Sequence, residues 1–273
     1  LVLLILFRFY PLGSAFYMSL FDWKLLRKQQ SFVGLANYRE ILADPLTWKI
    51  VGNTAYFALA STAIGLTLAL ITALLLSPIG RGSSVIRLLY FLPQMTSVIA
   101  VATIWKWLYQ DRFGLINQIL QLAGMPAVNW LSSPRWAMPS IIIMSVWGSV
   151  GYSTVIFLAG LRNIPISYYE AAAIDGASGV QMAWHITLPL LSPVISFSMI
   201  TGLIGGFNVF QQVYMLTRGG PLNSTRTIAL QIYDYAFGRQ WMGKAAVLAY
   251  VLFAIVMLLT LLQLRLNRKD VEL

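Results

Sequence analysis

The stretch "GRQWMGKA", residues 238–245, matches the spacing G-x-x-x-x-G-K of a phosphate-binding loop. In such a loop, backbone amides and the lysine hold the phosphates, and a following Ser or Thr hydroxyl binds Mg²⁺. Here Ala245 stands at the hydroxyl position, no strand is expected before the stretch, and an apolar segment follows it. We therefore expect this chain to bind no nucleotide.

Residues that bind metals or carry protons are scarce. The chain has no cysteine and one histidine, His185, which excludes a thiolate site and a histidine cluster for a metal. The nine Asp and Glu residues all fall outside the long apolar segments. Ion-coupled carriers usually bury an ionisable side chain in mid-membrane. We therefore expect neither a metal site nor an ion-coupling group.

A polar stretch, "YYEAAAIDGASG", lies between two apolar segments at residues 168–179. Ser167, with Glu170 three residues later, has the spacing of a capping box and predicts the start of a helix. Asp175 followed by Gly176 predicts its end, because Gly adopts the left-handed cap conformation at little steric cost. A helix this short is not stable alone in water, so another surface must hold it.

A second short helix is expected after the first. Ser178 and Gln181 repeat the capping-box spacing, and Pro189 predicts the end of this helix. The small side chains of Ala171 and Ala172 in the first helix would let another backbone approach closely. Residue types alone leave two interpretations open: a docking element for another protein, and an amphipathic connector on the membrane surface.

The stretch "SMITGLIGGFNVFQQVYMLT", residues 198–217, carries small and polar residues at helical spacings. On one face these are Gly202, Gly205, Gly206, Val209 and Gln212, with Asn208 and Gln211 nearby. Small residues in membrane helices usually indicate close helix packing. The alternative is a cavity wall, where glycines leave room and amides supply hydrogen bonds to a hydroxyl-rich ligand.

A comparable face occurs earlier in the chain. Gly148, Ser149 and Tyr152 share one face of an apolar segment, and Trp147 adjoins them. Small, hydroxyl and aromatic side chains together suit a surface that contacts a polar solute with apolar faces.

Long apolar segments contain or flank all of these residues. The mean hydropathy is +0.72, and about 20 apolar residues in a helix cross a hydrocarbon core of roughly 30 Å. The predicted spans are residues 1–20, 51–77, 86–108, 137–160, 191–215 and 245–265. We predict an all-α integral membrane protein, a single domain of residues 1–273 with six transmembrane helices in the lipid bilayer.

The net charge of +10 does not indicate a nucleic-acid partner, because the 19 basic residues are scattered and form no stripe beside exposed aromatic residues. We expect the natural N-terminus upstream of Leu1, because the chain begins without Met inside an apolar run. A signal peptide is disfavoured, since no small-x-small cleavage site ends that run and Pro11 interrupts it.

Basic residues give conflicting evidence about orientation. Arg265, Arg268 and Lys269 in the tail "RLNRKD" favour a cytoplasmic C-terminus. With six spans, both termini lie on one side, and residues 77–84 and 162–190 lie there too. The loops expected on the opposite side nevertheless hold more basic residues in total.

The stretch "EAAAIDGASGVQMAWHITLPL", residues 170–190, resembles the EAA signature of binding-protein-dependent ABC importer permeases. Further pieces resemble the carbohydrate-uptake branch, with its maltose, multiple-sugar and glycerol-phosphate systems. They are "FVGLANY" at 32–38, "NT" at 53–54, "FLAGLRNIP" at 157–165 and "LTRGGPLNSTRT" at 216–227. The resemblance covers nearly the whole chain. The given sequence shows neither an extra N-terminal helix nor a large periplasmic insertion, so we expect it to be nearer the six-helix members of the family than the largest maltose-type subunit.

The resemblance implies that residues 162–190 form a cytoplasmic two-helix coupling element between helices 4 and 5. It implies that this element docks on an ATPase subunit, with contacts from Glu170, Ala171, Ala172, Asp175 and Gly176. It also implies that the faces carrying Trp147 to Tyr152 and Gly202 to Gln212 line the substrate path. The location implied is the inner membrane of a prokaryotic cell, with several spans and both termini in the cytoplasm.

The expected function is that of a permease subunit, not an enzyme, in an ATP-driven importer of a sugar or sugar-like solute. Its expected partners are a second homologous permease, two ATPase subunits and an extracytoplasmic solute-binding protein. ATP and Mg²⁺ are expected on the ATPase subunits, and no cofactor on this chain. Monosaccharides, oligosaccharides, polyols and glycerol phosphate all stay open as substrates.

Two other classes of function are considered. An ion-coupled or facilitative carrier would act alone, and should show internal halves with broken helices. A membrane scaffold would have no substrate, and its polar stripe would serve only for packing. Co-purification with an ATPase supports the importer, whereas transport by the lone chain in vesicles supports the carrier.

Overall fold

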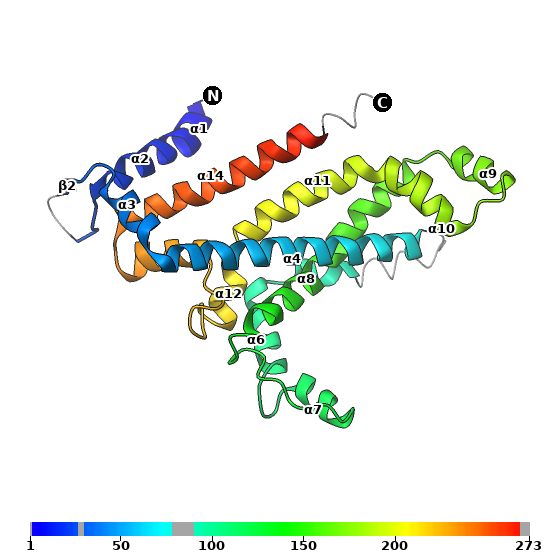
Figure 1. The fold of residues 1–273 in the computed structure, drawn as a ribbon, viewed down its shortest axis with the longest axis horizontal. Coiled ribbons are helices and arrows are strands. Elements are labelled where there is room, and N and C mark those ends of the chain that lie inside the picture. The colour runs from blue at the N-terminus through cyan, green and yellow to red at the C-terminus, as the bar shows by residue number, and fades with distance from the viewer. Residues whose placement is uncertain (1, 27–29, 78–89, 268–273) are drawn as a thin grey trace.

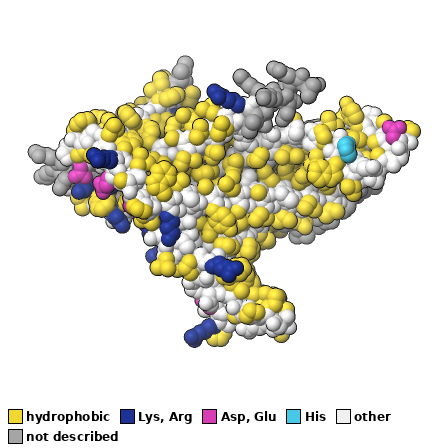
Figure 2. Space-filling model, viewed as in Figure 1, with side chains coloured by type: hydrophobic (Ala, Val, Ile, Leu, Met, Phe, Trp, Pro, Cys, Tyr) yellow, Lys and Arg dark blue, Asp and Glu magenta, His cyan; other side chains and the backbone are white. Residues whose placement is uncertain are grey.

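The computed structural model describes residues 2–26, 30–77 and 90–267, which form a bundle of long helices (Figure 1). Five helical segments within them are long and apolar enough to cross a membrane: Val2–Ser19, Pro45–Leu76, Ala137–Arg162, Gly179–Phe207 and Met242–Arg265. Apolar side chains cover most of the face shown in Figure 2. The chain is therefore a membrane-spanning helical protein, as its composition predicts.

The long segments have the following bounds. The first joins α1 (Val2–Leu4), the π-helical turn η1 (Ile5–Phe9) and α2 (Tyr10–Ser19); the others are α4 (Pro45–Leu76), α8 (Ala137–Arg162), the joined α10 (Gly179–Met182), η2 (Ala183–Thr187) and α11 (Leu188–Phe207), and α14 (Met242–Asn267). The shorter elements are β1 (Phe21–Asp22), β2 (Ser31–Phe32), α3 (Ala36–Ala43), α6 (Val98–Leu108), α7 (Leu115–Leu122), α9 (Ile166–Ile174), α12 (Gln211–Leu216), α13 (Ile228–Tyr233) and η3 (Asp234–Gly238).

Helix α4 lies at the centre of the packing. It packs along α8 and α11, and α14 packs against α2, α13 and α11. One core cluster joins Phe57 of α4 to Ile141 of α8 and Val213 of α12. Another joins Ala69 of α4 to Phe157 of α8 and Leu191 of α11. These contacts hold α4, α8 and α11 together around the site described below.

The predicted third span, residues 86–108, lies partly outside the described residues. Residues 90–95 are helical, Thr96 and Ser97 interrupt the helix, and α6 begins at Val98. The interruption follows Pro93, whose carbonyl accepts a hydrogen bond from the Thr96 amide at 3.3 Å. Within the part that is described, this span is therefore two helical pieces and not one.

The prediction that Pro189 ends the second short helix is wrong. Helix α10 continues through η2 into α11, so Gly179–Phe207 is one helical segment. The π-helical turn explains this continuity. The Leu188 amide bonds to the Ala183 carbonyl five residues back, and this widened turn lies directly before the proline, which has no N–H to donate.

The prediction of a continuous fifth helix over 191–215 is also wrong. Helix α11 ends at Phe207, and α12 begins at Gln211 after a short break. At the break, the Asn208 side-chain amide donates to the Ile204 carbonyl at 2.7 Å. A polar side chain thus bonds to the last turn of α11 where the helix ends. Val209 and Gln212 therefore do not continue the helical face of Gly202.

The first predicted capping box is absent. Helix α9 begins at Ile166 after the extended residue Pro165, and no side chain caps it, because Ser167 already lies inside its first turn. The second predicted box is confirmed. The Ser178 hydroxyl accepts from the Gln181 amide, and the Gln181 side chain accepts from the Ser178 amide at 2.7 Å.

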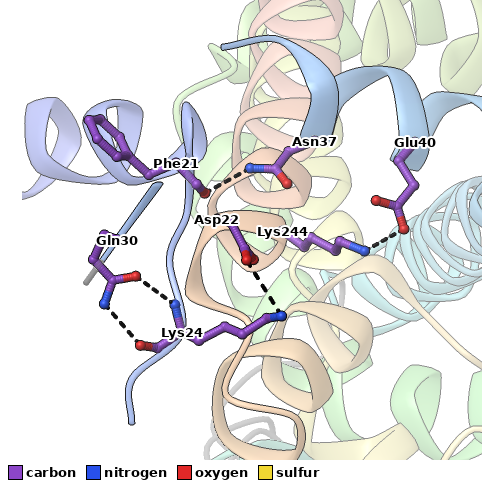
Figure 3. A network of polar contacts seen from close by, with 7 residues as sticks. All are labelled: Phe21, Asp22, Lys24, Gln30, Asn37, Glu40 and Lys244. Atoms are coloured by element: carbon purple, nitrogen blue, oxygen red, sulfur yellow. Dashed lines mark hydrogen bonds and ion pairs between the residues drawn. The ribbon is translucent and has the colours of Figure 1, made fainter. Parts of the chain in front are cut away.

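At the opposite end of the bundle from α9, the N-terminal strands and α3 are fastened to α14 (Figure 3). Asn37 of α3 is 6% exposed, and its amide nitrogen donates to the Ser19 and Phe21 carbonyls, each at 2.9 Å. Lys244 of α14 forms an ion pair with Glu40 of α3. We call these five residues, together with Gly243 of α14, the N-terminal clasp.

Close backbone packing completes the clasp. Gly243 lies so near β1 that an added Cβ would be 2.3 Å from the Phe21 carbonyl oxygen. The Gly243 amide also donates to the Trp23 carbonyl at 3.2 Å. A side chain at position 243 would therefore separate α14 from β1.

Candidate substrate cavity and coupling surface

A polar cavity of about 390 Å³ lies between α4, α8 and α11. Hydroxyl, amide and glycine residues make up most of its lining, with Phe57, Leu66 and Ile156 as apolar members. The polar and small residues are Ser61, Thr62 and Gly65 of α4, Gln94 of the helical residues 90–95, Ser145, Ser149, Tyr152 and Ser153 of α8, Ser198, Thr201, Gly202, Gly205 and Gly206 of α11, and Gln212 of α12. Polar groups that line a cavity in a membrane bundle can form hydrogen bonds with a polar solute.

Helical periodicity places a row of hydroxyl side chains of α8 along the cavity. Ser145, Ser149 and Ser153 recur every four residues, so they lie on one face of the helix, and Tyr152 lies beside them. The Tyr152 side chain is 49% exposed in the isolated chain. The prediction from sequence included Ser149 and Tyr152 and missed Ser145 and Ser153, although their spacing of four was visible.

The glycines of α11 divide into two groups. An added Cβ would lie 2.9 Å from the Thr62 methyl at Gly202, and 2.7 Å from the Ala58 Cα at Gly206. These two glycines therefore let α11 pack closely on α4. Gly205 differs, since nothing lies within 4 Å of the same position. Close packing thus accounts for two of the glycines, and open space in the cavity accounts for the third.

The four remaining predicted path residues do not line the cavity. Trp147 lines a separate apolar cavity of about 570 Å³ with Ile64 and Pro93, and its ring centroid is 5.7 Å from that of Trp105. Val209 is 4% exposed in the hydrophobic core. Gly148 and Asn208 do not line the polar cavity either, and Asn208 instead bonds to α11.

Several cavity residues were not anticipated. Ser61, Thr62 and Gly65 come from α4, whose polar face the sequence did not distinguish from the rest of a long apolar run. Ser198 and Thr201 lie on α11 one turn before the predicted glycines. A small hydroxyl residue in an apolar segment carries little signal by itself, because it usually bonds to its own helix.

Helix α9 forms a projecting surface at one end of the molecule (Figure 1). It has no buried residue, and large apolar side chains on it and on the following helix are exposed. Ile174 is 87% exposed and Trp184 is 67% exposed. Glu170 is also exposed. Exposed apolar area on this projecting surface indicates a protein contact or a membrane contact.

The shape of this surface is fixed by a turn and a tether. Gly176 has φ +78°, the left-handed conformation that the sequence predicts at the end of α9. The Tyr169 hydroxyl and the Thr187 hydroxyl are 2.9 Å apart, which ties α9 to η2. Ala171 and Ala172 lie on α9, and Asp175 is its C-terminal cap. The five predicted coupling residues therefore share one small element.

The bundle, its polar cavity and its projecting helix define a class of protein, a polytopic membrane permease. Residues 65–269 match the family described as binding-protein-dependent transport system inner membrane component. The chain belongs to this family of ABC transporter permeases. Its relatives are transport subunits and not enzymes.

Two relatives and one solved structure illustrate the similarity. The trehalose/maltose transport system permease protein MalF of Thermococcus litoralis is 34% identical over 98% of this chain and 90% of the relative. The lactose transport system permease protein LacF of Rhizobium radiobacter is 35% identical over 96% and 89%. The fold matches a bacterial ABC transporter involved in the import of the acidic polysaccharide alginate, with a TM-score of 0.86, 21% identity, and coverage of 98% and 92%.

Proposed function

We propose that this chain is a transmembrane subunit of an ATP-driven, binding-protein-dependent importer of a sugar or sugar-like solute. The observation that carries the proposal is the polar cavity between α4, α8 and α11 in a chain of this family. Relatives named for trehalose/maltose and for lactose support the solute class. The whole chain, residues 1–273, serves as one transmembrane domain with six spans.

The proposed complex contains a second homologous permease, two ATPase subunits and an extracytoplasmic solute-binding protein. A solved alginate ABC transporter with a similar fold is in complex with its periplasmic protein, which supports the last partner. The second permease would supply the wall that faces the cavity. ATP and Mg²⁺ bind the ATPase subunits, and this chain needs no cofactor.

Residues 162–190 are the proposed coupling element, and Glu170, Ala171, Ala172, Asp175 and Gly176 contact the ATPase. The exposed apolar side chains Ile174 and Trp184 suit a protein groove. In this mechanism, closure of the ATPase dimer moves α9. Because α10 is continuous with α11, that movement displaces a wall of the cavity and opens the cavity toward the binding protein.

The proposed topology places both termini and α9 in the cytoplasm of a prokaryotic cell, with α3 and α12 at the outer side. Cysteine labelling tests it, because the chain has no native thiol. With an impermeant reagent on intact cells, Leu222→Cys should be labelled and Asn163→Cys should react only after the cells are opened. The reverse pattern contradicts the topology.

Co-purification tests the function itself. The chain should purify with an ATPase and a second permease, and it should not transport a solute alone in vesicles. Transport by the lone chain would instead support a carrier. Ion coupling has no support among the described cavity residues, which include no carboxylate and no basic group.

A further inference from the structure

The described lining of the polar cavity carries no formal charge. Its described lining contains hydroxyls, amides, glycines and apolar side chains, and none of these residues is Asp, Glu, Lys, Arg or His. An anion that enters such a site gives up hydration and gains no countercharge from this wall. A neutral solute loses much less.

Several hydroxyls of the cavity are biased toward accepting hydrogen bonds. A serine or threonine has one proton to donate and two lone pairs. The Ser61 hydroxyl donates to the Phe57 carbonyl at 2.6 Å, and the Ser145 hydroxyl donates to the Ile141 carbonyl at 2.8 Å. The Thr201 hydroxyl likewise donates to the Phe197 carbonyl at 3.0 Å. With their protons engaged, these side chains offer oxygen lone pairs to a solute.

This bias favours a solute that donates hydrogen bonds. The hydroxyls of a sugar or polyol are donors, whereas carboxylate, sulfonate and phosphate oxygens only accept. The cavity does contain donors, among them the amides of Gln94 and Gln212 and the hydroxyls of Tyr152 and Ser198. None of them carries the positive charge that a desolvated anion requires.

Ser198 gives independent evidence that the cavity holds a polar ligand. Its side chain lines the cavity and is 4% exposed, and its hydroxyl has no hydrogen-bond partner within the described chain. A buried hydroxyl without a partner is costly. A solute hydroxyl in the cavity would supply the missing partner.

We infer that this cavity selects neutral polyhydroxylated solutes and discriminates against anionic sugars such as uronates and sugar sulfonates or phosphates. The inference rests on the proposed function, because it assigns the charge class of the solute at that same site. The fold itself does not impose it, since a transporter with a similar fold is involved in import of an acidic polysaccharide.

Binding to the assembled transporter tests the inference directly. The chain is purified with its co-purifying subunits in nanodiscs, without the binding protein, so that the latter's specificity does not enter. The probes are methyl glycosides of glucose, galactose and mannose, each paired with the matching methyl uronoside. Saturation-transfer NMR measures weak binding of each pair. The neutral member should bind at least about tenfold more tightly than its uronoside.

Two variants connect the preference to the cavity. Gln212→Lys adds a cation at nearly constant side-chain length and should reduce the preference for the neutral glycoside to about threefold or less. Ser198→Ala should weaken neutral binding about fivefold, since the solute loses a partner. Ser192→Ala, on the same helix but outside the cavity lining, is the control and should bind as the unmodified chain does.

Three outcomes would overturn the inference: equal or tighter binding of the uronosides to the unmodified transporter, a preference unchanged by Gln212→Lys in an intact complex, or binding of no probe in the panel. The proposed function fails by a different measurement, which is the absence of an ATPase from the purified complex. Failure of the charge preference is therefore distinguishable from failure of the importer assignment.

Discussion

The N-terminal clasp and helix α9 lie at opposite ends of the bundle and differ in how complete their contacts are. In the clasp, Asn37 is buried and its amide nitrogen bonds to two carbonyls. On α9, no residue is buried, and Ile174 is 87% exposed. The clasp is satisfied within one chain, whereas α9 has a defined shape without a partner surface. Substitutions in the clasp should therefore reduce stability, and substitutions on α9 should reduce assembly.

The largest effect is expected for Glu170→Lys on α9. If Glu170 pairs with a basic group in a partly desolvated groove, the substitution places two like charges together at a cost of several kcal/mol. The ATPase should be lost from the purified complex, and uptake should fall to background. Gln181→Ala, which removes a helix cap of about 1 kcal/mol, should be mild. Full ATPase recruitment by Glu170→Lys would support a membrane-surface connector, because lysine is favourable beside anionic lipid.

The next effect is expected in the clasp. Asn37→Ala removes the donor from two carbonyls and should lower stability by about 1–3 kcal/mol. Gly243→Ala should do the same through the contact with the Phe21 carbonyl. Both should lower the thermal midpoint of the complex without releasing the ATPase. Gly13→Ala is the matched control, since nothing lies within 4 Å of its added Cβ. An unchanged midpoint in both clasp variants would contradict this assignment.

A smaller contrast is expected between adjacent glycines of the cavity. Gly206→Ala should destabilise the complex by about 1–3 kcal/mol, because the new methyl meets the Ala58 backbone. Gly205→Ala should leave thermal stability unchanged and lower uptake, because the methyl enters open cavity space. Thermal midpoints and initial uptake rates measured on both variants test the contrast. Equal losses of stability would assign both glycines to packing.

The smallest effect is expected at the turn after α9. Gly176→Ala places a Cβ on a residue with φ +78°, which costs about 1–2 kcal/mol. The turn should persist with reduced ATPase affinity, measured by titration of the ATPase onto the permease complex. Gly179→Ala, at the start of α10 with no atom within 4 Å of the new methyl, should have unchanged affinity. A weaker ATPase complex with Gly179→Ala would indicate that the turn conformation is not the cause.

Sequence signals that depend on a few neighbouring residues predicted several of the helical elements. Long apolar runs predicted the helices, Gly176 predicted the left-handed turn, and Ser178 with Gln181 predicted the capping box. Each depends on a few neighbouring residues. The continuation of the helix through Pro189 was missed, because a π-helical turn accommodates the proline and has no sequence signature of its own.

Contacts between distant segments were harder to predict. Asn37 bonds to carbonyls 16 and 18 residues earlier, and nothing in the local pattern indicates that. The cavity was predicted in part, through Ser149, Tyr152, Gly202, Gly205, Gly206 and Gln212. Ser198 was missed, because the same serine reads as a neutral packing residue until the facing helices are placed. Val209 lies in the hydrophobic core and does not line this cavity, and the sequence did not reveal the break at Asn208 that moves it off the helical face.

The continuity of the helix from Gly179 to Phe207 has a mechanical consequence. The 29-residue segment is a single rod of about 43 Å, and it carries Trp184 near one end and Ser198 on the cavity wall, about 21 Å apart along its axis. The π-helical turn, Pro189 and Pro193 lie between these two residues, and such features are where a helix bends. A displacement applied at Trp184 would therefore reach Ser198 through these positions, and their stiffness would set how much of it arrives at the cavity wall.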